Sequence, residues 1–219
     1  CSAYFMARDL WEHPVRPIRW KDHRFPGSER KEATLSIEEA KRAIVLLAPR
    51  SRDMADAVEL AVYTGMRKNE LETITAGRVN LPERMVTVLA KRKARQTHRE
   101  RPVFLSTAAV ALLAERIAGK GPDELVFNLT NARKLWEWVR QEIGRPDVRW
   151  HDLRHTHGTL LGKTTNDRII KLQLGHTHIS TTQRYVHTNH AEAIEAVETI
   201  PALSDRKVVA FRPDVEKTA

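Results

Sequence analysis

Apolar residues recur every three or four positions along most of this chain, which is the spacing of an α-helix with one buried face. The segment TLSIEEAKRAIVLLAP is a clear case, because Ile37 and Ile44 fall on the same face of such a helix. Ser36 and Glu39 match a capping box, in which each side chain bonds the other residue's backbone N–H. The pattern therefore predicts a helix that begins just after Ser36 and ends before Pro49.

The same periodicity returns in several later segments, separated by breaks such as Thr64-Gly65. No internal repeat or low-complexity tract interrupts it. Further helices are expected at about 53–63, from about Arg67, from Ser106, from Thr130, and around 151–162, 167–174 and 190–199.

The middle of the chain changes period. RMVTVLAK alternates and is rich in β-branched residues, as a strand should be, and PVFL is a second candidate strand. The strongly basic run KRKARQTHRER lies between them, which predicts a β-hairpin with a basic tip. The expected fold class is therefore mainly α with a small antiparallel β-sheet.

Composition narrows the class of protein. Hydrophobic residues make up 41% of the 219 positions and charged residues 30%, which is typical of a globular protein. Cys1 is the only cysteine, so a disulfide framework and any multi-cysteine zinc or iron–sulfur site are excluded. No stretch approaches the roughly 18 apolar residues that a membrane span needs, so no membrane association is expected.

The charge balance suggests a polyanionic partner. Thirty-seven Lys and Arg against 28 Asp and Glu give a formal net charge of +9, and cationic side chains bind nucleic acid by releasing its condensed counterions. Residues 1–33 are irregular, basic and rich in proline, and no initiator Met precedes them. We expect 1–33 to be a linker or the end of a missing domain, 34–200 to be the catalytic domain, and 201–219 to be a C-terminal tail.

Candidate chemistry lies in five polar segments. These are TGMRKNE (64–70), AKRK (90–93), WHDLRHTH (150–157), LGHTH (174–178) and TTQRYVH (181–187).

Taken singly, the residues of these segments have ordinary explanations: an exposed arginine, a capping histidine, a buried tyrosine. Taken together, they suit phosphate chemistry. Arg67 follows Gly65 where a new helix begins, and free backbone N–H groups at a helix start favour anions. His151 and Arg154 are three apart, so on a helix they share a face, and the guanidinium fork matches phosphate oxygens. Tyr185 has an ordinary pKa of ~10 and needs a base or positive charge to act as a nucleophile.

The ordered motifs G-x-R-x-x-E, a hairpin lysine, H-x-L-R-H, L-G-H and T-x-x-Y resemble those of the tyrosine recombinase (phage integrase) family. The resemblance extends from about Leu35 to Thr199 and is specific, because five motifs occur in the family's order. It implies the integrase catalytic fold. It also implies an enzyme for DNA integration and recombination that breaks and rejoins DNA at specific sites through a 3′-phosphotyrosine intermediate.

The resemblance also implies a role for each residue of the site. Arg67 and Arg154 would hold the non-bridging oxygens of the scissile phosphate and stabilise the charge of the transition state. His151 would accept or orient the tyrosine proton, and His176 would bond a phosphate oxygen. Tyr185 would attack the phosphorus and release a 5′-hydroxyl.

A hairpin lysine would protonate the leaving 5′-hydroxyl. Lys91 fits that position when counted from the first strand and Lys93 when counted from the second, so both remain candidates. Glu70 matches an acidic position that supports the site by hydrogen bonding. No cofactor or metal is implied, because arginines take the place of the cations of two-metal nucleases. His157 stands where the family commonly has an aromatic residue and is expected to be packed.

Three other functions would use some of these residues. A metal-dependent nuclease could be built on His151, His155, His157 and Asp152, but their spacing does not place the three histidines on one helical face. A type IB topoisomerase-like enzyme would use similar residues. A DNA-binding relative without activity would not need all of them.

The expected partners follow from the same resemblance. They are double-stranded DNA, a homo-oligomer (a tetramer) on that DNA, and a core-binding domain missing at the N-terminus. The apolar face of the helix at 190–199 would pack on its own domain or on a neighbouring protomer. The expected location is cytoplasmic, with the nucleoid when the protein is bound to DNA.

Overall fold

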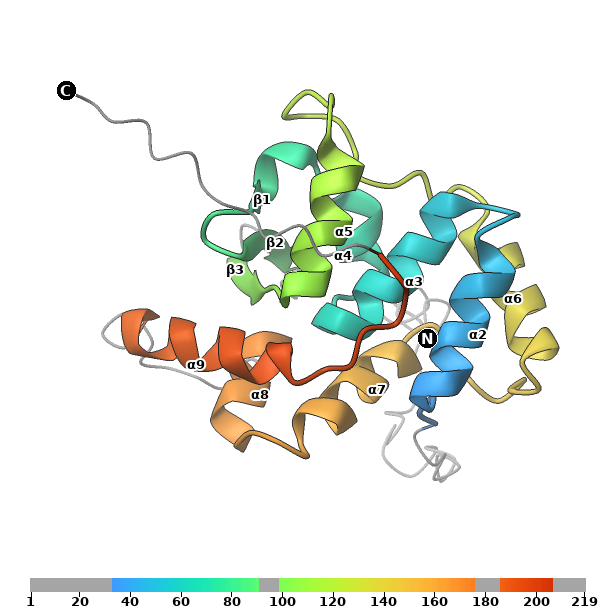
Figure 1. Ribbon diagram of the computed structural model, residues 1–219. Coiled ribbons are helices and arrows are strands. Elements are labelled where there is room, and N and C mark those ends of the chain that lie inside the picture. The colour runs from blue at the N-terminus through green and yellow to red at the C-terminus, as the bar shows by residue number, and fades with distance from the viewer. Residues whose placement is uncertain (1–32, 91–98, 176–185, 207–219) are drawn as a thin grey trace, which may run out of the picture. The chain divides into compact units, whose positions relative to one another are not determined.

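The computed structural model describes residues 33–90, 99–175 and 186–206 (Figure 1). These residues form a mainly helical fold with one small antiparallel sheet, so the expected fold class is confirmed. Among the described helices, none has both the length and the apolarity that crossing a membrane requires. The division of the chain at residues 33 and 200 stays a prediction.

The α-helices lie where the periodicity predicts them, except that the last one begins at Val186, four residues before its expected start. Ser36 and Glu39 make both bonds of the capping box, at 2.7 Å and 3.1 Å. The helices are α2 (Ile37–Leu47), α3 (Arg52–Thr64), α4 (Lys68–Thr73), α5 (Thr107–Ile117), α6 (Ala132–Glu142), α7 (Asp152–Leu161), α8 (Asp167–Leu174) and α9 (Val186–Glu198), with a 3-10 turn, η2 (Ala76–Arg78).

The sheet has three strands in the order β1-β2-β3, and both pairings are antiparallel. The predicted hairpin consists of β2 (Met85–Ala90) and β3 (Arg99–Phe104). Residues 91–98 of the basic run lie outside the described residues, and its last three residues belong to β3. Strand β1 (Val79–Asn80) was not predicted, because two residues are too few to show an alternating pattern.

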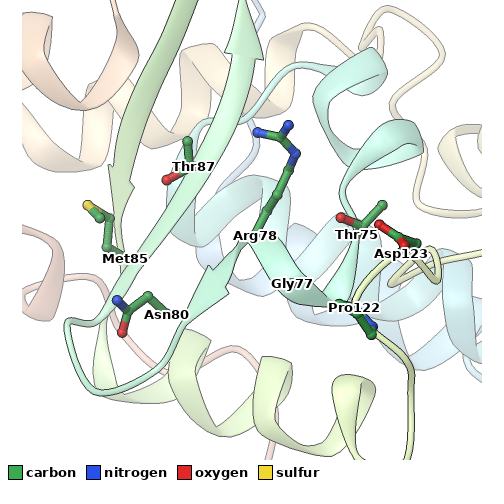
Figure 2. A pocket seen from close by; sticks show the side chains of 8 residues that line it. All are labelled: Thr75, Gly77, Arg78, Asn80, Met85, Thr87, Pro122 and Asp123. Carbon is green, nitrogen blue, oxygen red and sulfur yellow. The ribbon is translucent and has the colours of Figure 1, made fainter.

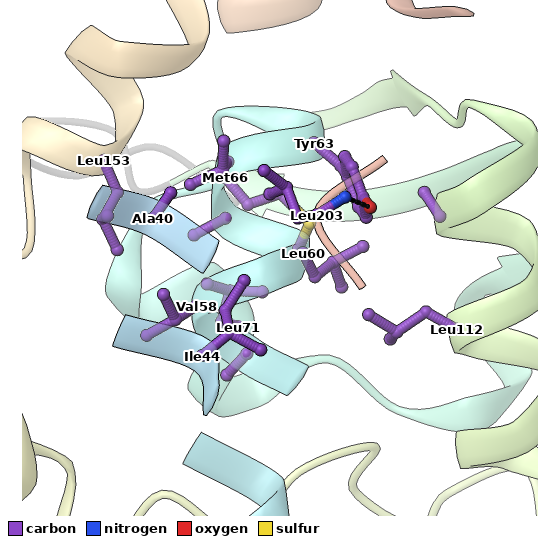
Figure 3. Close-up of a cluster of buried hydrophobic side chains, with 14 of the residues drawn as sticks. Ala40, Ile44, Val58, Leu60, Tyr63, Met66, Leu71, Leu112, Leu153 and Leu203 are labelled. Atoms are coloured by element: carbon purple, nitrogen blue, oxygen red, sulfur yellow. Dashed lines mark hydrogen bonds between the residues drawn. The ribbon is translucent and has the colours of Figure 1, made fainter. Parts of the chain in front are cut away.

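Helix α3 is the centre of the hydrophobic core. All its residues from Met54 to Thr64 are buried, and α2, α5 and α7 all pack against it. Figure 3 shows Leu60 of α3 in this cluster, with Leu112 of α5 and Leu153 of α7 among its members. Burying one such leucine contributes about 2 kcal/mol, so this packing stabilises the position of α3 in the core.

The chain returns to α3 after α9. Leu203 is buried, and its backbone N–H donates to the Tyr63 hydroxyl at 2.7 Å (Figure 3). Helix α9 itself contacts α8 and β3 of its own chain. In the described residues, the apolar face of α9 therefore packs within its own domain, which was one of the two possibilities left open by the sequence.

An ionic cluster accompanies this returning segment, and we call it the α3 cluster. Arg206 donates to Asp56 at 2.8 Å and lies 3.6 Å from Glu59, and both carboxylates are buried on α3. Further ion pairs join the same cluster to α5. Its members are Arg52, Asp53, Asp56, Glu59, Glu115, Arg116 and Arg206.

Candidate active site

The structure describes half of the residues predicted for the site. Arg67, Glu70, His151 and Arg154 lie in the described part of the chain. Lys91, Lys93, His176 and Tyr185 lie outside the described residues.

Arg67 stands at the junction between α3 and α4. Helix α3 ends at Gly65, whose φ of 65° lies in the left-handed region that glycine adopts most easily. Two residues later, Arg67 caps α4 in an extended conformation. Its guanidinium side chain is 40% exposed. The core helix thus delivers this arginine to the surface through a tight turn.

Glu70 holds Arg67 at two points. Its carboxylate accepts the backbone N–H of Arg67 at 2.8 Å and the side-chain Nη1 at 3.0 Å. Burial of Glu70 opposes ionisation, but the charge of Arg101, the hydrogen bond from the Arg67 N–H and the charge of Arg67 lower its pKa overall. Glu70 is therefore a carboxylate at neutral pH that fixes the orientation of Arg67.

Arg154 is buried on α7 and is held by carbonyl groups. Nη1 donates to the Gly65 oxygen at 2.8 Å, and Nη2 donates to the Leu174 oxygen. Burial, and then the charges of Arg67 and Arg101, lower the pKa of Arg154 to about 9. It remains charged at neutral pH, and among the described residues it forms no ion pair. Its positive charge is oriented but not neutralised.

His151 precedes α7 and is exposed, whereas Arg154 one turn later is buried. The His151 ring lies edge-on to His155, with centroids 5.1 Å apart. Partial desolvation, and then the charges of His155, Arg154 and Arg67, lower the pKa of His151. It is consequently neutral at pH 7 and has the protonation state that a proton acceptor requires.

Arg101 belongs with Arg67, Glu70 and Arg154, although the sequence motifs did not identify it as a site residue. It lies on β3, is 7% exposed, and donates to Glu70 Oε2 at 2.8 Å. The signal was present: Arg101 alternates with exposed Glu100 and precedes buried Val103 by two positions. A charge on the buried face of a strand needs a specific partner, and the sequence pattern alone gave no means of naming it.

His157 packs beneath the turn at Gly65. It is fully buried, and its Nδ1 lies 2.9 Å from the Val62 carbonyl oxygen. Burial lowers the pKa of His157 to about 4, so the ring is neutral and donates from Nδ1. A Cβ at Gly65 would lie 2.7 Å from this ring, which leaves room only for glycine. The expectation of a packed histidine is confirmed.

Two open hollows lie elsewhere. One, of about 490 Å³, lies beside β1 and β2 and is lined by Thr87 of β2, Arg78 of η2 and their neighbours (Figure 2). The other, of about 520 Å³, lies between the starts of α3 and α6. Neither includes Arg67, His151 or Arg154. Within the described ranges, no three His, Cys, Asp or Glu side chains converge as a metal site would require.

Comparison with known proteins places this arrangement in a family. The model of the Phage integrase family matches residues 34–192, which is most of the chain. The chain belongs to the tyrosine recombinase (phage integrase) family. The match contains all the residues predicted for the site, from Arg67 to Tyr185.

Similar proteins carry the corresponding names. Tyrosine recombinase XerA of Saccharolobus solfataricus is 32% identical over 166 residues, covering 74% of this chain and 55% of that protein. A tyrosine recombinase of Thermosipho africanus is 28% identical over 205 residues, covering 87% of this chain and 68% of that protein. The chain thus spans between half and about two thirds of the length of these relatives.

Solved structures share the fold. A crystal structure of XerA recombinase is 26% identical with a TM-score of 0.53, and the match covers 78% of this chain and 68% of that one. The catalytic domain of bacteriophage HP1 integrase, 24% identical, has a TM-score of 0.54 and covers 72% of this chain and 88% of that one. The second likeness supports the integrase catalytic fold alone.

Proposed function

We propose that this chain is the catalytic part of a site-specific DNA recombinase that cuts and rejoins DNA through Tyr185. The observation that carries the proposal is the pair Arg67 and Arg154. One is half exposed and the other buried, and both are oriented around the turn at Gly65 with a surplus of positive charge. Family membership adds the tyrosine motif to this phosphate-binding arrangement.

In this proposal the two arginines bind the scissile phosphate. Guanidinium donors held rigidly before the reaction stabilise the charge that grows on the phosphoryl oxygens, which is usually the largest catalytic contribution. Glu70 keeps Arg67 in place, and the carbonyls of Gly65 and Leu174 do the same for Arg154. No metal ion is needed for this charge stabilisation.

Proton transfer would be divided among the remaining groups. The neutral ring of His151 accepts or orients the proton of the Tyr185 hydroxyl as it attacks phosphorus. The tyrosyl oxygen forms a bond to phosphorus, the bond to the 5′-oxygen breaks, and Lys91 or Lys93 gives that oxygen its proton. His176 bonds a phosphate oxygen.

The covalent step conserves the phosphodiester linkage for a second reaction. A 5′-hydroxyl of another strand attacks the phosphotyrosine, and the reverse proton transfers restore the free tyrosine. The reaction therefore exchanges strands without ATP and without hydrolysis.

Double-stranded DNA is the proposed partner, supported by the net charge of +9. Solved structures of the same fold include a lambda integrase dimer bound to a core site, and the Tn1549 integrase with transposon end DNA. We extend the proposal to a tetramer on DNA, to a core-binding domain preceding residue 34, and to a cytoplasmic protein that joins the nucleoid when bound.

A covalent trapping experiment tests the proposal. The chain is incubated with nicked suicide duplexes of randomised sequence, in EDTA, and the products are separated by denaturing electrophoresis. We expect a protein–DNA adduct that Tyr185→Phe abolishes, while duplex binding by that variant stays within about twofold because only one hydroxyl is removed. EDTA-sensitive cutting without an adduct would contradict the proposal.

A further inference from the structure

The Arg101 side chain joins two separate segments of the chain, helix α4 and the end of helix α8. Its Nη2 donates to Glu70 Oε2 at 2.8 Å, and its Nη1 donates to the Gln173 carbonyl oxygen at 2.8 Å. Glu70 in turn holds Arg67. One guanidinium on β3 therefore joins the start of α4 to the last turn of α8.

The α8 end of this connection is tightly built. The Gln173 side chain is fully buried and donates to the carbonyls of Thr64 and Phe104, both at 3.1 Å. It also accepts the Phe104 N–H at 3.0 Å. The C-terminus of α8 is thereby tied to β3 and to the end of α3, directly before the L-G-H motif.

Gly175 explains why that motif contains glycine. Its φ is 66°, and a Cβ there would lie 2.4 Å from Cδ of Arg101 and 2.9 Å from its Nε. The Arg101 side chain thus fills the space in which any other residue would place its side chain. Gly175 and Arg101 are fitted to each other.

Lysine could not reproduce these contacts. A single ammonium lacks the planar fork that lets arginine donate in two fixed directions. The side chain of Arg101 is buried, so its direct role cannot be contact with a DNA backbone at the surface. Its reach is limited to Glu70 and the α8 terminus.

We propose that Arg101 is a positioning residue for strand cleavage. It sets Arg67 through Glu70, and through Gln173 it sets the end of α8, where the Leu174 carbonyl holds Arg154. This inference rests on the proposed function. It adds a residue that contacts no reacting atom but determines whether two separate parts of the phosphate site are in register.

The test compares Arg101→Lys with the wild-type chain in single-turnover adduct formation on the nicked duplex pool. We expect the adduct rate at saturating DNA to fall by about 10- to 100-fold, because small misplacements of catalytic groups have effects of that size. The half-saturating DNA concentration should stay within about threefold, since Arg101 is buried. A variant that merely failed to fold would not combine a lower adduct rate with a nearly unchanged half-saturating DNA concentration.

Two further variants sharpen the result. Arg116→Lys is the matched control, because Arg116 bridges Asp53 and Asp56 away from the site, and its adduct rate should equal that of the wild type. Glu70→Gln should slow the adduct as Arg101→Lys does. The double variant should be no slower than the worse single one, because both changes act through one contact.

Hydrogen exchange gives a measurement that needs no DNA. The Arg67 N–H bonds Glu70, and the Gly175 N–H bonds the Lys171 carbonyl. We expect Arg101→Lys to speed exchange at both amides and Arg116→Lys at neither. Unchanged exchange at both, or a wild-type adduct rate in a folded Arg101→Lys, would overturn the positioning role. Absence of any adduct from the wild type with altered exchange would instead contradict the proposed function alone.

Discussion

Two ionic clusters adjoin helix α3, and they have opposite charge balance. The cluster at the end of α3 contains Arg67, Arg101 and Arg154 with Glu70 as their carboxylate among the described residues, which leaves two positive charges in excess. The α3 cluster contains four carboxylates and three arginines, and so one negative charge in excess.

The pKa shifts of the buried carboxylates also differ between the two clusters. The pKa of Glu70 is lowered, because neighbouring arginines outweigh its burial. The pKa of Glu59 in the α3 cluster is raised, because burial outweighs its bonds from Ser204, Arg206 and Tyr63. The α3 cluster is therefore close to charge balance, whereas the arginine-rich cluster carries an excess of positive charge that suits the proposed phosphate ligand.

The largest expected effect is that of Arg154→Lys. Lysine keeps the charge but cannot bond the Gly65 and Leu174 carbonyls while presenting a second edge to a phosphate. We expect adduct formation to fall by roughly 10³-fold, as for loss of an oriented donor at a transition state. Single-turnover trapping measures it, and a rate near that of the wild type would remove the distinction between the clusters.

In the α3 cluster, Arg206→Met should lower the stability of the fold. Removing this guanidinium leaves Asp56 and Glu59 buried with less compensation, so the free energy of unfolding should fall by about 3 kcal/mol. Urea denaturation measures it. Arg52→Met is the matched control, because Arg52 pairs with the same Asp56 but is 58% exposed, and its loss should be below about 1 kcal/mol. Equal losses would show that burial does not govern the cluster.

Acid should weaken the region beneath the site. His157 has a folded pKa of about 4 against an ordinary value of 6.5. The unfolded chain therefore binds a proton first as the pH falls, and stability present above pH 6.5 is lost progressively towards pH 4. Between pH 6.5 and 5 we expect a loss of about 1.5 kcal/mol from this group.

Urea denaturation across that pH range gives the slope. His157→Leu cannot titrate and should flatten it, whatever the variant's absolute stability. The raised pKa of Glu59 has the opposite effect on stability as the pH falls, because the folded chain binds this proton more readily than the unfolded chain. A slope that survives in His157→Leu would place the acid-sensitive group elsewhere.

The sequence predicted the helices and the hairpin well because their causes are local. The capping box at Ser36, the break at Gly65 and the alternation in β2 are each written in a few adjacent residues. The two-residue strand β1 was missed because it is defined by pairing with β2 and not by its own pattern.

The site residues were predicted from short ordered motifs. Because such motifs are local, they could not reveal contacts between residues that are far apart in the sequence. Arg67 and Glu70 form one local motif, so their ion pair could be anticipated from spacing. Arg101 and Gln173 are 72 positions apart and meet only in the folded chain. Without coordinates, Arg101 was simply one more cation in a basic run, and burial is what reveals it.

The turn at Gly65 has a consequence for the order in which the molecule matures. Its carbonyl oxygen accepts a hydrogen bond from Arg154, and the His157 ring occupies the space that a Cβ at this position would need. Arg154 therefore obtains its orientation only after α3 and α7 have packed and α8 has come to rest. A nascent or partly unfolded chain holds the same arginines without their common geometry. The proposed phosphate site therefore depends on the packed fold and is not formed by any one of its local motifs.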